Sequence, residues 1–371
     1  MAASAVGVIF SNLHEENVPE LVRRRTMAST PFGGRYRLVD FQLSNMVNSG
    51  ITTIGLMASN NYRSLIDHVG SGKDWDLARK DGGVILLPPF SEASERFFTT
   101  RLEALKSLTG FLSRRREKYV VLSDSDSVAR IDISDILEYH ELKKADLTLV
   151  THEENLDDYQ SFTVLEANEQ GRVTDVKVNP RHAKGEKGNV YINVMIVDRQ
   201  YLLNLVSDAA AHGQTSFKKD IIAKQFNFLK IYRYDFKGFY AGITSMAAYY
   251  KHNMALLDKS VRDELFGARD IYTKVRDSAP SKYGEAATVT NSLISDGCEI
   301  EGTVENSILF RGVKVAKGAV VKNCIMMQDT IVGVGASLNC VITDKSVVIG
   351  ANRTLSGCET LPYFIQKGTS L

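Results

Sequence analysis

Cysteine and histidine are the residue types that most often build a metal centre, and their spacing in this chain argues against one. The four cysteines lie at positions 298, 324, 340 and 358, and none belongs to a CxxC pair. His14, His68, His140 and His252 show no HxxxH or similar spacing, so we interpret them as structural or exposed. The sequence therefore predicts no metal site in this chain. Widely spaced thiols without a secretion signal also fit a cytoplasmic protein.

Arginines are the side chains that could bind phosphate groups. Arg35 and Arg37 lie in the segment GGRYR (33–37), and a guanidinium can hold two phosphate oxygens at once. A solvated surface arginine is the alternative for Arg35. We interpret the run at 23–25 as a solvated face, with phosphate binding as the alternative. We interpret the run at 114–116 as a cationic helix C-terminus.

Over positions 1–245, short apolar runs alternate with segments of helical spacing, and these elements must position the residues named above. This alternation predicts an α/β domain with a mostly parallel sheet and helices on both faces, which binds ligands beyond the carboxyl ends of its strands. The expected strands are 6–10, 53–58, 84–87, 119–123 and 147–151, the expected helices are 40–49, 62–69, 101–112 and 133–144, and a hairpin is expected at 165–176.

A connector is expected at 246–287, with a helix over 246–257 and a polar, irregular stretch over 262–282. From 288 to 371 small or aliphatic residues recur every six positions. One series is Leu309, Val315, Val321 and Met327, and a second is Val313, Ala319, Ile325 and Ile331. This period predicts a parallel β-helix with the cysteines as small fillers, and a small β-sandwich is the alternative.

Composition excludes several classes of protein. The chain has 371 residues, 44% of them apolar, which is enough for two or three domains with sizeable cores. Lys plus Arg (45) balance Asp plus Glu (44), so there is no electrostatic footprint for nucleic acid. We find no run of ~18 apolar residues that would span a membrane. The first ten residues lack the basic start of a signal peptide and predict a strand.

A resemblance to a known family rests on the segment at 31–51, which reads PFGGRYRLVDFQLSNMVNSGI. It resembles the signature after the nucleotide loop in ADP-glucose pyrophosphorylases, also called glucose-1-phosphate adenylyltransferases. The similarity continues through 54–69, 123–150, 238–257 and 291–315. It implies a sugar-nucleotidyltransferase (Rossmann-like) domain, a C-terminal left-handed parallel β-helix and a tetramer. The implied reaction joins ATP and glucose 1-phosphate into ADP-glucose and pyrophosphate, for glycogen or starch.

The resemblance fails where that family holds ATP. The family loop LAGGxGTRL is replaced by FSNLHEENV (10–18), so its glycines fall on Asn12, Leu13 and Glu15 and its arginine on Asn17. Glycine is needed where the backbone approaches phosphate closely. Glutamates at 15 and 16 would also repel a triphosphate, by about 1–4 kcal/mol for like charges ~4 Å apart. The lysine of RAKPAVPFGG becomes Met27, and the GTADA stretch is replaced by FFTTRLEAL (97–105).

The family's two metal aspartates are also missing. Without a gap, the aspartate of LSGDH falls on Ser125 in LSDSDS (122–127), and a shift of one residue is the alternative that would put Asp124 or Asp126 there. The aspartate of YWxDVGT falls on Gly242 in FYAGITS (239–245). Mg²⁺ needs oxygen ligands to bridge the phosphates, and each lost interaction of this kind costs about 2–4 kcal/mol of transition-state stabilisation. The sequence therefore predicts a very poor enzyme alone, with no catalytic residue and no cofactor of its own.

The resemblance then matches the non-catalytic regulatory subunit that some Gram-positive bacteria pair with a catalytic subunit. It implies a heterotetramer in which the partner uses Mg²⁺ and ATP, a small-molecule effector at Arg35 and Arg37, and self-association when the chain is alone. Two alternatives stay open: an active nucleotidyltransferase in which Asp124 or Asp126 supplies a metal carboxylate, and a partner-independent, metabolite-sensing β-helix scaffold.

Overall fold

A computed structural model describes residues 4–88 and 100–371, which fold into two compact units. The first unit contains the chain up to Glu15, Arg25–Ser29 and Val39–Gly242. The second contains Glu16–Arg24, Thr30–Leu38 and Ile243–Leu371. Two short N-terminal segments therefore belong to the mainly C-terminal unit. The domain boundaries predicted from the sequence, at 1–245, 246–287 and 288–371, stay predictions.

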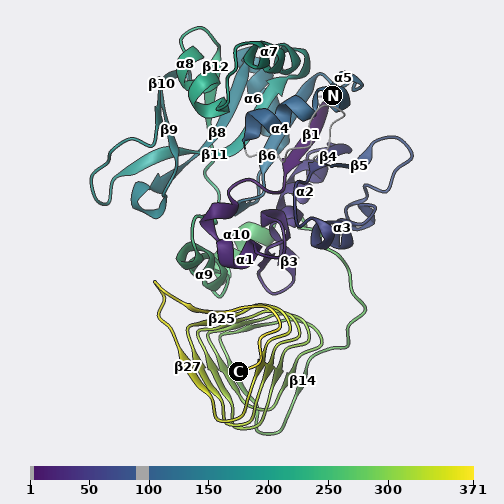
Figure 1. Cartoon of the computed structure of the whole chain (residues 1–371), viewed down its shortest axis with the longest axis vertical. Helices are drawn as coiled ribbons and strands as arrows, with labels where there is room; N and C mark the ends of the chain where they lie inside the picture. The colour runs from purple at the N-terminus through teal and green to yellow at the C-terminus, as the bar shows by residue number, and fades with distance from the viewer. Residues whose placement is uncertain (1–3, 89–99) are drawn as a thin grey trace. The chain divides into compact units, whose positions relative to one another are not determined.

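The first unit is built on a nine-stranded sheet with the order β10-β9-β11-β6-β1-β4-β5, in which β8 pairs with β11 and β12 pairs with β8 (Figure 1). Strands β6, β1, β4 and β5 are parallel, as are β8 and β12, whereas β11 is antiparallel to β6, β8 and β9. The predicted α/β sheet is confirmed, and it is mixed. Its strands are β1 (Ala5–Phe10), β4 (Thr53–Met57), β5 (Gly83–Leu87), β6 (Tyr119–Asp124), β8 (Leu147–Asn155), β9 (Thr163–Ala167), β10 (Val173–Val178), β11 (Lys187–Asp198) and β12 (Ile231–Asp235).

Helices cover both faces of this sheet. On β1, Val6, Val8 and Phe10 point into the large core shared with helices α4 and α7. Gly7 points to the opposite face, where a Cβ would lie 2.4 Å from the sulfur of Met46 on helix α2. The helices of this unit are α2 (Leu38–Asn48), α3 (Arg63–Val69), α4 (Arg101–Ser107), α5 (Thr109–Ser113), α6 (Ile133–Lys143), α7 (Arg199–Ala211) and α8 (Ala223–Gln225), with a π-helical turn at Phe217–Ile222.

The predicted helix at 101–112 is divided into α4 and α5. Helix α4 begins at a capping box, in which the Thr100 hydroxyl accepts a hydrogen bond from the backbone N–H of Glu103 and the Glu103 carboxylate accepts one from the N–H of Thr100. A two-stranded sheet beside the main one pairs β7 (Ser127–Ala129) with β13 (Tyr240–Gly242) in antiparallel register. This short ladder places the chain after β6 next to residues from the end of the unit.

The second unit contains a parallel β-helix whose coils run through three parallel sheets (Figure 1). The prediction from the six-residue period is therefore confirmed, and the left-handed sense stays an expectation from the resemblance. The first sheet consists of β14 (Lys282–Tyr283), β17 (Glu299–Ile300), β20 (Lys314–Val315), β23 (Ile331–Val332) and β26 (Val348–Ile349). The second consists of β15 (Thr288–Thr290), β18 (Thr303–Glu305), β21 (Val320–Lys322), β24 (Ser337–Asn339) and β27 (Thr354–Ser356). The third consists of β16 (Leu293–Ile294), β19 (Ile308–Leu309), β22 (Ile325–Met326), β25 (Val341–Thr343) and β28 (Tyr363–Ile365).

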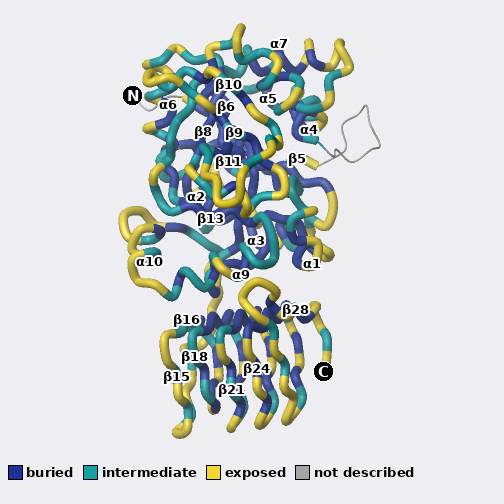
Figure 2. Tube along the Cα trace, turned by 90° about the vertical axis from the view of Figure 1, so that its left-hand side faces the viewer, coloured by how far each residue is buried: buried dark blue, intermediate teal, exposed yellow. Residues whose placement is uncertain are grey.

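Buried residues recur from coil to coil (Figure 2). All four members of the first predicted series are buried, but Ile331 in the second series is 41% exposed. The reason is the length of the coil: Val315 pairs with Val332, 17 positions further on, whereas three six-residue steps need 18. Three steps of six from Val313 therefore pass Thr330, which is buried, and reach Ile331, which pairs with the exposed Lys314. Cys298, Cys324 and Cys340 fill buried positions as expected, whereas Cys358 is exposed.

The remaining elements of the second unit are α1 (Pro19–Val22), a hairpin of β2 (Pro31–Phe32) and β3 (Tyr36–Arg37), α9 (Met246–Ala255) and α10 (Lys259–Phe266). Helix α10 reaches into a stretch that the sequence predicted as irregular. Asp258 caps its N-terminus by accepting a hydrogen bond of 2.8 Å from the N–H of Ser260. Within the described ranges, no helix is long and apolar enough to cross a bilayer.

Candidate functional site

The site lies at the carboxyl ends of β1 and β6. These strands are parallel and in register, with Phe10 opposite Asp124, so the loop that follows β1 and the residues that follow β6 emerge at the same edge of the sheet. This is the edge at which open α/β sheets bind ligands. The loop after β1 is also the segment where the family has its glycine-rich nucleotide loop.

Side-chain hydrogen bonds hold the loop after β1 in place. Asn12 donates to Oε1 of Glu15 over 2.7 Å and to Oδ1 of Asn60 over 2.6 Å, and its own Oδ1 accepts from the N–H of Ser59 over 2.8 Å. His14 has a φ of 66°, a left-handed conformation that favours glycine. Hydrogen bonds of a polar side chain therefore hold this bend.

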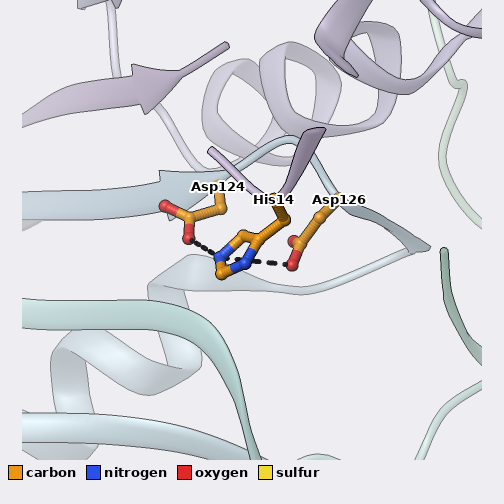
Figure 3. A group of neighbouring side chains, drawn as sticks. All are labelled: His14, Asp124 and Asp126. Atoms are coloured by element: carbon orange, nitrogen blue, oxygen red, sulfur yellow. Dashed lines mark hydrogen bonds and ion pairs between the residues drawn. The ribbon is translucent and has the colours of Figure 1, made fainter. Parts of the chain in front are cut away.

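His14 reaches from this loop to two aspartates (Figure 3). Its Nε2 lies 2.9 Å from Oδ2 of Asp124 and 3.7 Å from Oδ2 of Asp126. Both carboxylates are buried, and the His14 side chain is 24% exposed. We call these three residues the His14 cluster. Burial disfavours the imidazolium, but the neighbouring carboxylates of Asp126 and Asp124 outweigh burial and raise the pKa of His14.

Arg101, from the first turn of α4, fixes the other oxygen of Asp124. Its guanidinium lies 2.5 Å from Oδ1 of Asp124 and donates to the hydroxyl of Tyr191 over 2.8 Å. Burial alone would favour the neutral acid, yet the charges of Arg101 and His14 lower the pKa of Asp124. Asp124 is therefore an ionised carboxylate held between a permanent cation and an imidazole.

Asp126 is in a different environment. Burial, with the charge of Asp124 adding to it, raises the pKa of Asp126. Asn193 donates to Oδ2 of Asp126 over 2.8 Å, and its Nδ2 lies 3.4 Å from Nε2 of His14. Asn193 sits at an irregularity of β11 between Tyr191 and Met195 with a φ of 62°, which directs its amide toward the cluster.

The two positions on which the family's metal aspartates fall, Ser125 and Gly242, do not suit Mg²⁺. Ser125 is buried, and its hydroxyl has no hydrogen-bond partner among residues 4–88 and 100–371. Gly242 faces Ser127 across the β7–β13 ladder, and a Cβ there would lie 3.1 Å from the Tyr159 hydroxyl and 3.2 Å from that of Tyr240. Burial raises the pKa of Tyr159 above its usual range. Neutral phenols replace the second carboxylate, so these residues do not fit a magnesium–triphosphate complex.

The other predicted site residues are dispersed. Met27 is buried in a short 3-10 helix, Met27–Ser29. Asn17, in the second unit, donates to the carbonyl of Ile243 over 3.3 Å. Arg35 is exposed in the β2–β3 turn, whereas Arg37 is buried. The replaced GTADA stretch falls partly outside the described residues, which resume at 100. The roles assigned to all these residues stay predictions.

Sequence reasoning missed His14, Arg101 and Asn193. We interpreted His14 as structural or exposed because no second histidine lies at a metal spacing. The missed signal was positional, because a histidine that follows the first strand and aspartates that follow a neighbouring parallel strand meet at one edge of the sheet. Asn193 gave no such signal, since its orientation depends on an irregularity in β11.

The fold and the site define a nucleotidyltransferase-like protein with a hexapeptide β-helix. Residues 20–260 match the family model "Nucleotidyl transferase", and residues 277–358 match "GlmU-like, C-terminal hexapeptide". The chain belongs to the nucleotidyltransferase family that includes the glucose-1-phosphate adenylyltransferases.

Relatives that carry two different protein names align with most of this chain. "Glycogen biosynthesis protein GlgD" of Bacillus subtilis is 34% identical over 98% of this chain and 96% of its own length. The protein of the same name from Geobacillus stearothermophilus is 36% identical over the same shares. "Glucose-1-phosphate adenylyltransferase" of Geobacillus stearothermophilus is 30% identical over 87% of this chain and 84% of its own length.

Proposed function

We propose that this chain is the regulatory, catalytically degenerate subunit of a glucose-1-phosphate adenylyltransferase in glycogen biosynthesis. One observation carries the proposal: the chain aligns along nearly its full length with proteins named for glycogen biosynthesis, while the family positions for ATP and Mg²⁺ hold Asn17, Met27, Ser125 and Gly242. A chain selected for turnover would keep those groups, because they stabilise charge that develops in the transition state.

The partner in this proposal is a catalytic subunit of the same family, which would bind Mg²⁺ and ATP in a cytoplasmic heterotetramer. The regulatory chain would alter its partner's turnover through contacts that differ between two states of the complex, since only differential contacts shift such an equilibrium. Arg35 supports an effector role because its guanidinium is exposed at the tip of a hairpin, where it can reach a phosphorylated metabolite.

The test measures pyrophosphate release by the purified chain alone, by the catalytic subunit alone and by the two co-expressed. We expect no measurable release from this chain, a complex in size-exclusion chromatography, and a changed turnover or effector response for the mixture. Turnover by the lone chain within the usual enzymatic range of ~1–10³ s⁻¹ would contradict the proposal, and loss of that turnover in the Asp124→Asn/Asp126→Asn variant would identify an active enzyme. Failure to form any complex would favour a partner-independent scaffold.

A further inference from the structure

The His14 cluster brings together three side chains of metal-ligand type from two different segments. Nε2 of His14 and a carboxylate oxygen from each of Asp124 and Asp126 all lie within 4.8 Å of one another. We propose that His14, Asp124 and Asp126 bind a divalent transition-metal ion of the zinc or cobalt class. This inference departs from the expectation, drawn from residue spacing, that the chain holds no metal.

The separations between the donor atoms fit a single ion. Ligands about 2.0–2.1 Å from a tetrahedral zinc are about 3.3 Å from one another. The distances of 2.9 Å from His14 to Asp124 and 3.7 Å from His14 to Asp126 lie on either side of that value (Figure 3). The oxygens of Asp124 and Asp126 lie within 4.8 Å of each other, so the side chains must move for all three atoms to share one ion.

The donor set selects a transition metal over Mg²⁺. One imidazole nitrogen with two carboxylates suits zinc, cobalt, iron or manganese, whereas Mg²⁺ favours oxygen ligands and retained water. Asp124 and Asp126 lie on either side of Ser125, the position on which one of the family's metal aspartates falls without a gap. The proposed ion is therefore distinguished from the family's magnesium by its histidine ligand and by its metal class.

Residues around the cluster already have the arrangement of an outer ligand shell. Arg101 binds Oδ1 of Asp124, so Oδ2 remains directed toward His14. A metal-bound carboxylate is commonly oriented by a partner of this kind.

Two buried oxygens point independently to a missing ligand. Oδ1 of Asp126 and Oδ1 of Asn193 have no hydrogen-bond partner in the part of the chain that the structure describes, although these residues are only 8% and 7% exposed. Leaving such atoms unpaired in the interior is unfavourable. If the amide of Asn193 turned over, its oxygen would take the place of Nδ2, which now lies 2.8 Å from Asp126 and 3.4 Å from His14. Asn193 would then supply a fourth ligand.

The direct test is a titration of the full-length chain with Co²⁺ and Zn²⁺ after treatment with a chelator, and without an affinity tag. Cys358 should first be replaced by Ser, because its exposed thiol could bind zinc by itself. We expect one equivalent of metal per chain in calorimetry and a visible Co²⁺ spectrum of nitrogen and oxygen ligands. The absence of saturable binding would overturn the proposal.

Variants locate the ion. His14→Gln and Asp126→Asn should each weaken binding at least 10–100-fold, the usual loss when even an outer-shell partner is removed. Lys218→Met should strengthen binding a few-fold, because the charge of Lys218 acts on both His14 and Asp126. His212→Gln is the matched control, since His212 and Asp208 form an exposed ion pair elsewhere. Circular dichroism confirms that each variant is folded, and unchanged affinity in His14→Gln would refute the site.

Discussion

Gly242 lies so close to Tyr159 that a Cβ on the glycine would be 3.1 Å from the tyrosine hydroxyl. The family has a metal-binding aspartate at this position, and here the space next to it is taken by the phenols of Tyr159 and Tyr240. These phenols occupy the space that a carboxylate side chain at position 242 would need. A single substitution would not rebuild the family's magnesium site.

We accordingly predict that Gly242→Asp restores no pyrophosphate release and lowers stability by about 1–3 kcal/mol, the usual cost of overpacking. Thermal melting and a coupled pyrophosphate assay measure the two effects. Gly242→Ala is the control, because it adds the Cβ without the charge. Appearance of Mg²⁺-dependent turnover in Gly242→Asp would show that the other replaced positions are compatible with catalysis.

The pair of Arg101 and Asp124 leads to a second prediction. Arg101→Met leaves a buried carboxylate without its cation and should destabilise the chain by about 3–5 kcal/mol in urea denaturation. The double variant Arg101→Met/Asp124→Leu removes both charges and should recover part of that loss. Lys177→Ala breaks an exposed pair with Glu166 and should cost at most ~1 kcal/mol. Equal losses for Arg101→Met and Lys177→Ala would contradict this account of the buried pair.

Much of the fold could be predicted because apolar periodicity reports directly on burial. Strand β1 and helix α2 lie where their patterns indicated, within one or two residues. The division between α4 and α5 and the helix α10 depend on local hydrogen bonds and caps that apolar spacing does not encode. The antiparallel strand β11 was also missing from the predicted elements, and it makes the sheet mixed.

The site could be predicted only in part. The replaced glycine loop and the positions Ser125 and Gly242 are visible in the sequence because a motif defines where to look. The His14 cluster required the pairing of Phe10 with Asp124, which brings two distant segments to one edge. Which oxygen of Asp124 faces Arg101, and which faces His14, depends on three-dimensional packing that no spacing rule describes.

The β-helix allows a matched comparison of two isoleucines six positions apart in one predicted series. Ile325 is completely buried and Ile331 is 41% exposed. We predict that Ile325→Ala costs about 2–5 kcal/mol through a cavity, whereas Ile331→Ala stays within ~0.5 kcal/mol. Chemical denaturation monitored by circular dichroism gives both values. Similar losses at the two positions would mean that burial does not decide the cost of shortening these side chains.

His140 supplies a prediction of pH dependence. It is buried, its Nδ1 lies 2.8 Å from the Thr148 hydroxyl, and burial lowers its pKa to about 4. Between pH ~6.5 and ~4 the unfolded chain binds a proton that the folded imidazole does not, so stability falls as the pH falls, by up to ~3 kcal/mol. His140→Gln should flatten that part of the stability profile relative to the exposed control His212→Gln. Parallel profiles for the two variants would refute the assignment.

Substitutions of Arg35 and Arg37 can separate a role in effector binding from a structural role. Arg35 is exposed in its hairpin turn and Arg37 is 6% exposed. In a complex with the catalytic subunit, Arg35→Ala should weaken the response to a sugar bisphosphate or to inorganic phosphate several-fold, because a forked phosphate contact is lost. Its melting temperature should stay unchanged, whereas Arg37→Ala should lower the melting temperature because it removes a buried, packed side chain. Arg35→Lys is the conservative control, since it keeps the charge without the fork and should retain part of the response. An unaltered effector response in Arg35→Ala, measured on an intact complex, would assign this arginine to the solvated surface.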